Sequence, residues 1–230
     1  MTPEAIMLFT AGFGTRMGVL TKDRPKPLIA VGGRTLLDHA LDQADGAGVR
    51  RIVANLHYLP QQIRQHLSTR PDIQFSAEAE TILETGGGLR RALPLLGRGP
   101  VLTLNTDAVW TGENPVAELR KAWNPDRMDG LLLLVPREGA TGHTGPGDFD
   151  LDSDGRIRRG QSHVYTGAGI VRTEGLAAIG EEVFSLNRLW NDMVGAERLY
   201  GTIHRGGWCD VGRPESIPLA ERMLREAGHD

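Results

Sequence analysis

A short apolar run near the start of the chain ends in a cluster of glycines, and this stretch limits the possible folds most strongly. Ile6–Phe9 has the composition of a buried strand, and Gly12, Gly14 and Gly18 follow it. Glycine lets the backbone approach a ligand and turn several N–H groups toward one point, an arrangement that holds anions such as phosphate. The stretch therefore predicts a strand followed by a loop that binds a polyphosphate.

Two cationic side chains accompany this loop. The guanidinium of Arg16 is planar and can hold two phosphate oxygens at once. Lys26 stands between Pro25 and Pro27, whose rings fix the backbone on either side and give the ammonium group a set position. The alternative interpretation is an ordinary glycine-rich turn beside an incidental surface arginine and lysine.

Two better-known glycine loops do not match. A Walker A loop ends in Gly-Lys-Ser or Gly-Lys-Thr, which this stretch lacks. A dinucleotide-binding Gly-x-Gly-x-x-Gly motif requires glycine where Met17 stands and a helix directly afterwards. The site is therefore expected to hold a nucleotide in a different manner from either motif.

Beyond the loop, strand-like and helix-like segments alternate, which predicts a parallel sheet with right-handed crossovers. Strands are expected at residues 28–31, 51–56, 73–76, 100–104, 130–135, 164–171 and 199–203. Helices are expected after Thr35, from Glu84, and at 61–67, 114–122, 174–179, 185–194 and 215–227. Residues 136–162 form either a lid or a β-hairpin, and Asp154-Gly155 favours the hairpin. Ligands of such sheets bind at the carboxyl ends of the strands.

Two further features have both a functional and a structural interpretation. Gly86, Gly87 and Gly88 open a predicted helix, where glycine normally weakens the structure. A flat base or sugar passing over their backbone explains them, and tight packing of the helix on a strand is the alternative. Asp107 follows a predicted central strand, where a carboxylate facing a phosphate loop suits Mg²⁺ and an isolated aspartate suits a turn.

The composition excludes several classes of protein. The 230 residues include 26 basic and 29 acidic side chains, so the net charge of −3 gives no electrostatic case for nucleic acid or an anionic membrane. The single cysteine excludes an internal disulfide and fits a reducing compartment. No stretch approaches the ~20 apolar residues of a membrane span, and residues near the N-terminus show neither the basic n-region nor the long apolar h-region that a secretory leader would have. We expect a cytoplasmic protein.

The motifs resemble those of a known superfamily. Ala11-Gly-x-Gly-Thr-Arg-Met-Gly, Leu20-Thr21 and Pro25-Lys-Pro-Leu28 are similar to the signature of the sugar-1-phosphate nucleotidylyltransferases. The resemblance continues through Leu83-Glu-Thr-Gly-Gly-Gly88, Gly147-Asp-Phe149 and Trp208-Cys-Asp210-Val-Gly212, and so covers nearly the whole chain. Within the superfamily, the chain most resembles the N-acetylmuramate α-1-phosphate uridylyltransferases.

This resemblance implies an α/β fold, a single Rossmann-like (GT-A-like) domain over residues 1–230 with a mixed, mostly parallel central sheet flanked by helices. It implies transfer of UMP from UTP to N-acetylmuramate α-1-phosphate in peptidoglycan recycling. The partners are then a nucleoside triphosphate and a sugar-1-phosphate, with no nucleic acid and no membrane, and the oligomeric state stays open. The alternatives are cytidylyl or guanylyl transfer to phosphocholine or another sugar-1-phosphate, and a nucleotide-sugar-binding module without turnover.

The resemblance also assigns site residues. Those expected at the nucleotide are Ala11, Gly12, Gly14, Thr15, Arg16, Lys26, Glu78, Gly86, Gly87 and Asn105. Arg16, Lys26 and Asp107 are expected to be catalytic, and Asp107 and Asp210 to bind Mg²⁺, or Mn²⁺ in its place. Asp148 and Gly167 are expected at the sugar. Arg158, Arg159 and His163 are candidates for meeting the lactyl carboxylate of muramate.

The chain departs from the superfamily pattern near the expected metal site. Thr106 replaces the usual glycine before Asp107, and Ala108 is an extra residue after it. Val135-Pro-Arg-Glu-Gly139 stands where glucose-1-phosphate enzymes carry a Glu-Glu-Lys-Pro-type segment, which argues against glucose-1-phosphate as acceptor.

Overall fold

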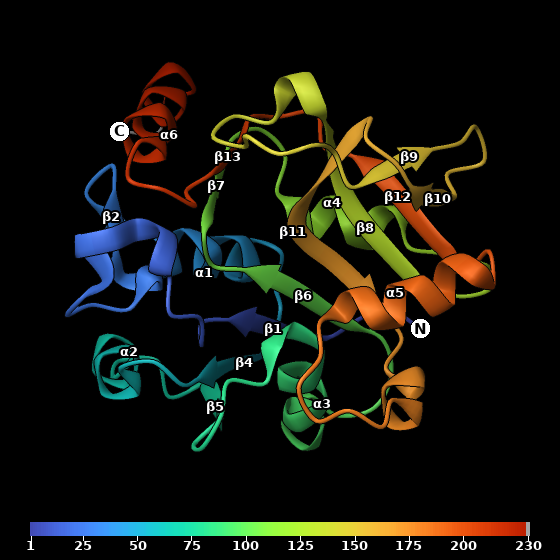
Figure 1. Ribbon diagram of the computed structural model, residues 1–230, viewed down its shortest axis with the longest axis horizontal. Helices are drawn as coiled ribbons and strands as arrows, with labels where there is room; N and C mark the ends of the chain where they lie inside the picture. The colour runs from blue at the N-terminus through green and yellow to red at the C-terminus, as the bar shows by residue number, and fades with distance from the viewer. Residues whose placement is uncertain (229–230) are drawn as a thin grey trace.

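A mixed sheet of nine strands lies at the centre of the computed structural model, which describes residues 1–228 (Figure 1). Its strands are β1 (Ala5–Phe9), β4 (Arg51–Leu56), β5 (Ile73–Ala77), β6 (Val101–Asn105), β8 (Gly130–Pro136), β9 (Phe149–Leu151), β10 (Ile157–Arg159), β11 (His163–Val171) and β12 (Leu199–Ile203). Their order is β10-β9-β11-β6-β1-β4-β5, with β8 pairing to β11 and β12 to β8. Within this sheet β10 and β11 run against the other strands, so the mixed, mostly parallel α/β fold is confirmed.

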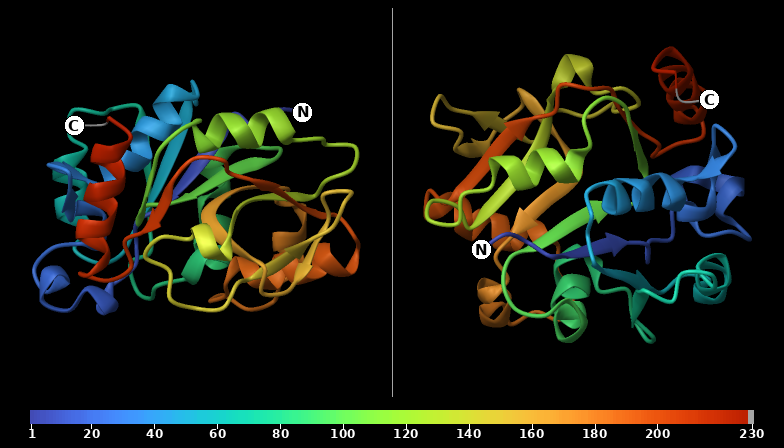
Figure 2. Two further views of the ribbon diagram at one scale, coloured as in Figure 1. Left: turned by 90° about the horizontal axis from the view of Figure 1, so that it is seen from above. Right: turned by 180° about the vertical axis from the view of Figure 1, so that it is seen from behind.

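Helices cover both faces of the sheet (Figures 1 and 2). One face carries α1 (Leu36–Gly46), α2 (Pro60–His66) and α4 (Pro115–Ala122), and the other carries α3 (Glu84–Leu96) and α5 (Leu186–Gly195). Side chains of β1 alternate between these layers, since Ile6 and Leu8 pack on the α1 side and Met7 on the α3 side. None of the helices within residues 1–228 has the length and apolar character needed to cross a bilayer.

Besides the apolar layers on the two faces of the sheet, a third hydrophobic cluster connects the glycine loop with the C-terminal helix. Two short ladders contribute to it, β2 (Ala30–Val31) with β3 (Arg34–Thr35) and β7 (Ala108–Trp110) with β13 (Trp208–Asp210). The helix α6 (Ser216–Glu226) packs here, with Leu224 against the same cluster as the fully buried Met17 of the loop. The residues near Asp210 are therefore held beside the loop that follows β1.

Most local predictions are confirmed. Thr35 caps α1 by accepting a hydrogen bond from the backbone N–H of Asp38, whose carboxylate in turn accepts one from the N–H of Thr35. Residues 149–159 form the expected hairpin. The strand expected at 28–31 is shorter, because Lys26–Leu28 forms a 3₁₀ turn in which the N–H of Leu28 donates to Pro25. The segment Glu174–Ala178 is likewise a 3₁₀ turn.

Candidate active site

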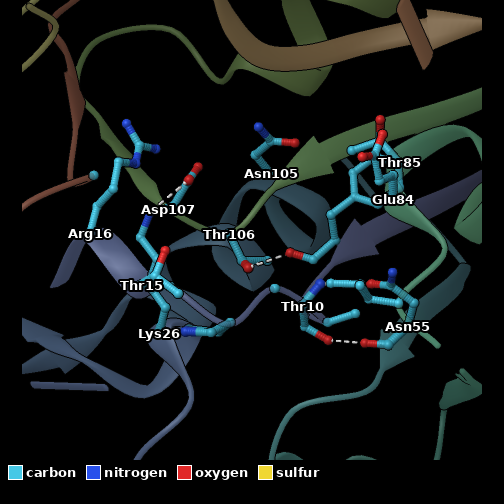
Figure 3. A pocket seen from close by; sticks show the side chains of 17 residues that line it. Thr10, Thr15, Arg16, Lys26, Asn55, Glu84, Thr85, Asn105, Thr106 and Asp107 are labelled. Carbon is cyan, nitrogen blue, oxygen red and sulfur yellow. Dashed lines mark hydrogen bonds and ion pairs between the residues drawn. The ribbon is translucent and has the colours of Figure 1, made fainter. Parts of the chain in front are cut away.

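A first cavity of about 300 Å³ opens at the carboxyl ends of β1 and β6 (Figure 3). Figure 3 shows Thr15, Arg16, Lys26 and Asp107 at one end of it, and Asn55 and Thr10 at the other. The lining residues are Phe9, Thr10, Ala11, Gly12, Gly14, Thr15, Arg16, Lys26, Pro27, Asn55, Ile82, Glu84, Thr85, Asn105, Thr106, Asp107 and Gly212. The position agrees with the general placement of ligands in parallel sheets.

The glycine loop is fixed closely against Lys26. Gly14 adopts a left-handed conformation with φ of 63°, and a side chain there would come within 2.7 Å of the Cβ of Lys26. The hydroxyl of Thr21 donates to the carbonyl of Gly14 at 3.0 Å, and Met17 anchors the loop in the core. A glycine is therefore required at position 14, where loop and lysine meet.

Lys26 forms an ion pair inside the cavity. Its Nζ lies 2.8 Å from Oδ2 of Asp107, and the side chains are 10% and 29% exposed. The turn after β6 that carries Asp107 is also held in place, since the hydroxyl of Thr106 donates to the carbonyl of Phe9 at 2.7 Å. Residues far apart in the sequence thus converge on one point.

Asp107 directly precedes β7, and Asp210 ends the neighbouring strand β13. Asp210 pairs with Ala108 across the antiparallel β7–β13 ladder, and the N–H of Val211 donates to the carbonyl of Asp107 at 2.8 Å. Burial raises the pKa of Asp210, the negative charge of Asp107 raises it further, and nearby cations oppose the rise. Two adjacent carboxylates whose charges disfavour each other form a donor set that fits a hard divalent cation such as Mg²⁺.

A second cavity of about 230 Å³ adjoins the first and shares Arg16, Asn105 and Asp107 with it. It is lined by Arg16, Asn105, Asp107, His143, Asp148, Val164, Tyr165, Thr166, Gly167, Trp208 and Asp210. β11 pairs with β9 at His163 and with β6 only from Ala168 onward, so its intervening edge borders the cavity. The predicted sugar residues Asp148 and Gly167 therefore lie together beside both predicted metal ligands.

Asp148 and Gly167 also have structural roles. One carboxylate oxygen of Asp148 accepts a hydrogen bond from the N–H of Tyr165 at 2.8 Å, which satisfies the strand edge. Gly167 has φ of 87°, and a side chain there would come within 2.8 Å of the Cβ of Asn105. The pairing of β11 with β8 shifts register between Tyr165 and Gly169, so Gly167 lies in an irregular part of the strand that lines the second cavity.

Gly86 and Gly87, which were predicted at the nucleotide, do not line the first or second cavity. Their N–H groups donate to the carbonyl of Phe184, at 2.9 and 3.0 Å. A side chain on Gly86 would collide with Phe184, and one on Gly87 with the carbonyl of Glu182. These glycines are explained by tight packing within the protein, the alternative that the sequence left open.

Glu78, also predicted at the nucleotide, does not line the first cavity. Its side chain is buried and accepts hydrogen bonds from Nδ2 of Asn55 at 2.7 Å and from the N–H of Leu83 at 2.8 Å. Asn55 in turn accepts from the N–H of Thr10 at 2.7 Å. Glu78 therefore orients a residue of the first cavity without lining that cavity itself.

Several lining residues were not identified from the sequence. Thr10, Asn55, Ile82, Glu84 and Thr85 all border the first cavity. Glu84 has φ of 59°, a conformation that residues other than glycine rarely adopt. The motif Leu83-Glu-Thr-Gly-Gly-Gly88 did indicate this part of the first cavity, but its polar residues Glu84 and Thr85 line the cavity and its glycines do not.

The candidates for binding a lactyl carboxylate lie elsewhere. Arg158 extends toward Asp150, and the guanidinium of Arg159 donates to the side chains of Asn187 and Asn191. His163 does not line the second cavity, although it belongs to β11. This part of the sequence-based prediction is not supported by the geometry.

Known proteins resemble the chain in sequence and in fold. The family model of the MobA-like NTP transferase domain matches residues 6–145. N-acetylmuramate alpha-1-phosphate uridylyltransferase of Caulobacter vibrioides is 38% identical, over 98% of each chain. The protein of the same name from Neisseria meningitidis serogroup B is 34% identical, over 90% of this chain and 92% of its own length. The structure of HddC from Yersinia pseudotuberculosis superposes with a TM-score of 0.76 at 19% identity, over 97% of this chain and 100% of that one.

Proposed function

The chain belongs to the family of MobA-like NTP transferase domains and is a sugar-1-phosphate nucleotidyltransferase, and we propose that it transfers UMP from UTP to N-acetylmuramate α-1-phosphate. The products of this reaction are a UDP-sugar and pyrophosphate. Two relatives that bear this activity in their names align over most of the chain, which supports the choice of both substrates.

One observation carries the proposal at the level of the site. Two cavities meet at Arg16, Asn105 and Asp107, one bordered by the glycine loop and the other by Asp148 and Gly167. A nucleoside triphosphate on the loop and a sugar phosphate in the second cavity would meet at this junction. Nucleotidyl transfer requires the phosphates of both substrates to come together in this way.

The acceptor needs little activation. The second pKa of a phosphate monoester is about 6, so the sugar phosphate is already a dianion at neutral pH. One of its oxygens attacks the α-phosphorus of UTP, the new P–O bond forms, and the bond to pyrophosphate breaks. The protein must align two mutually repelling anions and stabilise the charge that develops, and a general base is not required.

Each proposed role follows from the position of the residue. The N–H groups of the Gly12–Gly14 loop and the guanidinium of Arg16 hold the departing pyrophosphate. Lys26, fixed at the junction, brings the α-phosphate and the sugar phosphate together. Asp107 and Asp210 would hold Mg²⁺, which when bound neutralises charge on phosphate oxygens. Asp148 and the backbone at Gly167 contact the sugar ring.

Release of pyrophosphate tests the proposal. Four nucleoside triphosphates are each combined with N-acetylmuramate, glucose, mannose and N-acetylglucosamine 1-phosphates. We expect the highest kcat/KM with UTP and the muramate substrate. Preference for GTP, or for glucose-1-phosphate, would leave the family unchanged and overturn the choice of substrates.

A further inference from the structure

A third cavity of about 190 Å³ continues from the second one and meets the glycine loop at Arg16. It is lined by Arg16, Gly142, His143, Thr144, Gly145, Asp210 and Arg213. Arg16, His143 and Asp210 line the second cavity as well, so the two spaces are continuous. Neither His143 nor Arg213 was identified as a site residue from the sequence.

The walls of the third cavity are held by backbone contacts. Thr141 pairs with Cys209, and its carbonyl accepts the N–H of Asp210 at 2.9 Å. A side chain on Gly142 would come within 3.1 Å of Oγ of Ser216, so this loop lies directly on β13 and the start of α6. Nε2 of His143 lies 2.9 Å from the carbonyl oxygen of Pro146, which fixes the imidazole.

The backbone of Arg213 is held just before α6, and the residue is exposed. It follows Gly212, a residue of the first cavity, and its carbonyl accepts the N–H of Ser216 at 3.0 Å. Within residues 1–228, the ion pairs formed by arginines involve neither Arg16 nor Arg213. An entering anion would therefore bind these guanidinium groups without first displacing a carboxylate of the protein.

The charge of the third cavity favours an anion. Two arginines and a histidine line it together with one acidic residue, Asp210, which is also a proposed metal ligand. Guanidinium groups bind carboxylates and phosphates through paired, charge-assisted hydrogen bonds. The ligand is thus expected to carry a negative group at this end.

The position of the third cavity distinguishes between two candidate anions, the phosphates of UTP and the lactyl carboxylate of the sugar. The terminal phosphates of UTP belong on the glycine loop. Of this loop only Arg16 lines the third cavity, whereas Gly12, Gly14, Thr15 and the neighbouring Lys26 line the first cavity and not the third. The third cavity instead extends the space bordered by Asp148. The geometry points to a subsite for the lactyl carboxylate of the acceptor sugar, bound by Arg213 and His143.

This inference rests on the proposed function, since it concerns the acceptor named there. N-acetylmuramate differs from N-acetylglucosamine by the lactyl ether that carries the carboxylate. A subsite for this group would let the enzyme distinguish the two sugar phosphates, because an unpaired cationic pocket loses its interaction when the group is missing. Arg213 is then a specificity-determining residue for the reaction.

The test compares two acceptors in the same protein. Values of kcat/KM are measured for N-acetylmuramate and N-acetylglucosamine α-1-phosphates with saturating UTP, in the wild type, Arg213→Ala and Arg225→Ala. Arg225 is an exposed arginine in the last turn of α6, so this control removes the same charge outside the cavity. Circular dichroism verifies that each variant is folded.

We expect Arg213→Ala to lower the ratio of kcat/KM for the muramate over the glucosamine substrate at least about tenfold, the scale of one charge-assisted hydrogen bond. Arg225→Ala should keep the wild-type ratio, and Arg213→Lys should be intermediate. An unchanged ratio in Arg213→Ala overturns the inference, as does a rise in KM for UTP, which would assign the cavity to the triphosphate. If the wild type uses neither acceptor, the proposed function itself has failed, and this is seen before any variant is compared.

Discussion

The ammonium group of Lys26 lies 2.8 Å from Oδ2 of Asp107, although the two residues are 81 positions apart. The pair forms where the first cavity meets the second, so it joins the proline-flanked segment to the carboxyl end of β6. Because both side chains are mostly buried, their charges act in a medium where electrostatic interactions are stronger than in water. In the proposed reaction this is where charge builds up on the transferred phosphate.

Lys26→Ala should lower kcat at least ~100-fold, since it removes one preorganised charge from the site of transfer. The fold should persist, because the neighbouring prolines and the 3₁₀ turn keep the backbone in place. Lys22→Ala is the matched control, as Lys22 is exposed and precedes the same segment. A Lys26→Ala variant with near-normal kcat would remove this lysine from the mechanism.

Asp210→Asn should make the metal-free protein more stable and less active. The pKa of Asp210 is raised in the folded state by burial and then by Asp107, so its ionisation is less favourable there than in the unfolded chain. Above the unfolded pKa of about 4, the ionised carboxylate therefore lowers stability, and the neutral amide removes this effect. We expect the Tm at neutral pH without metal to rise by about 2 °C or more.

Addition of Mg²⁺ separates the metal role from the stability effect. Binding to the folded state should raise the Tm of the wild type and should raise that of Asp210→Asn or Asp107→Asn much less. Chelator should abolish activity, and Mg²⁺ or Mn²⁺ should restore it. If Mg²⁺ stabilises one aspartate variant as strongly as the wild type, that aspartate is structural.

Asp148→Ala should raise KM for the sugar phosphate at least several-fold and affect KM for UTP much less, the pattern of binding lost on one substrate. Because Asp148 also accepts the N–H of Tyr165, alanine disturbs the strand edge as well. Asp148→Asn keeps an acceptor for that hydrogen bond and should retain the wild-type Tm, yet still raise KM for the sugar. If Asp148→Asn keeps the wild-type KM for the sugar phosphate, the carboxylate of Asp148 does not bind the sugar and its role is structural.

Gly12 and Gly86 should respond to alanine in opposite ways. A methyl group on Gly12 meets no protein atom within 4 Å, and Gly12 lines the cavity proposed for UTP, so activity should fall at least ~10-fold with little change in Tm. A methyl group on Gly86 collides with Phe184, so stability should fall by about 1–3 kcal/mol. Thermal unfolding and the KM for UTP are measured for both variants. If Gly86→Ala is as stable as the wild type but has a raised KM for UTP, Gly86 contacts the nucleotide and the packing explanation is wrong.

The first cavity was largely predictable because its parts are local or follow from strand order. The apolar run of β1, its glycines and Lys26 lie close together in sequence. The carboxyl ends of parallel strands meet at one edge of the sheet, which brings Asp107 to them. Periodicity likewise located β4 and β12 at the residues observed.

Other features depend on contacts that sequence patterns do not reveal. Gly86 and Gly87 could not be assigned to packing without knowing that residues 182–184 lie against them. The pairing of Thr141 with Cys209 holds the loop of His143 beside β13, and His143 and Arg213 then line the same cavity. Arg158 and Arg159 were plausible by composition alone, but the hairpin turns them toward Asp150 and α5.

The most direct test of the central claim follows the oxygens of the acceptor phosphate. The wild type is incubated with UTP, Mg²⁺ and N-acetylmuramate α-1-phosphate whose phosphate carries ¹⁸O. The ¹⁸O content of each product is then measured by mass spectrometry. If a sugar-phosphate oxygen attacks the α-phosphorus, all of the label appears in UDP-N-acetylmuramate and none in pyrophosphate. Label in the pyrophosphate, or release of pyrophosphate without a UDP-sugar, would contradict the account.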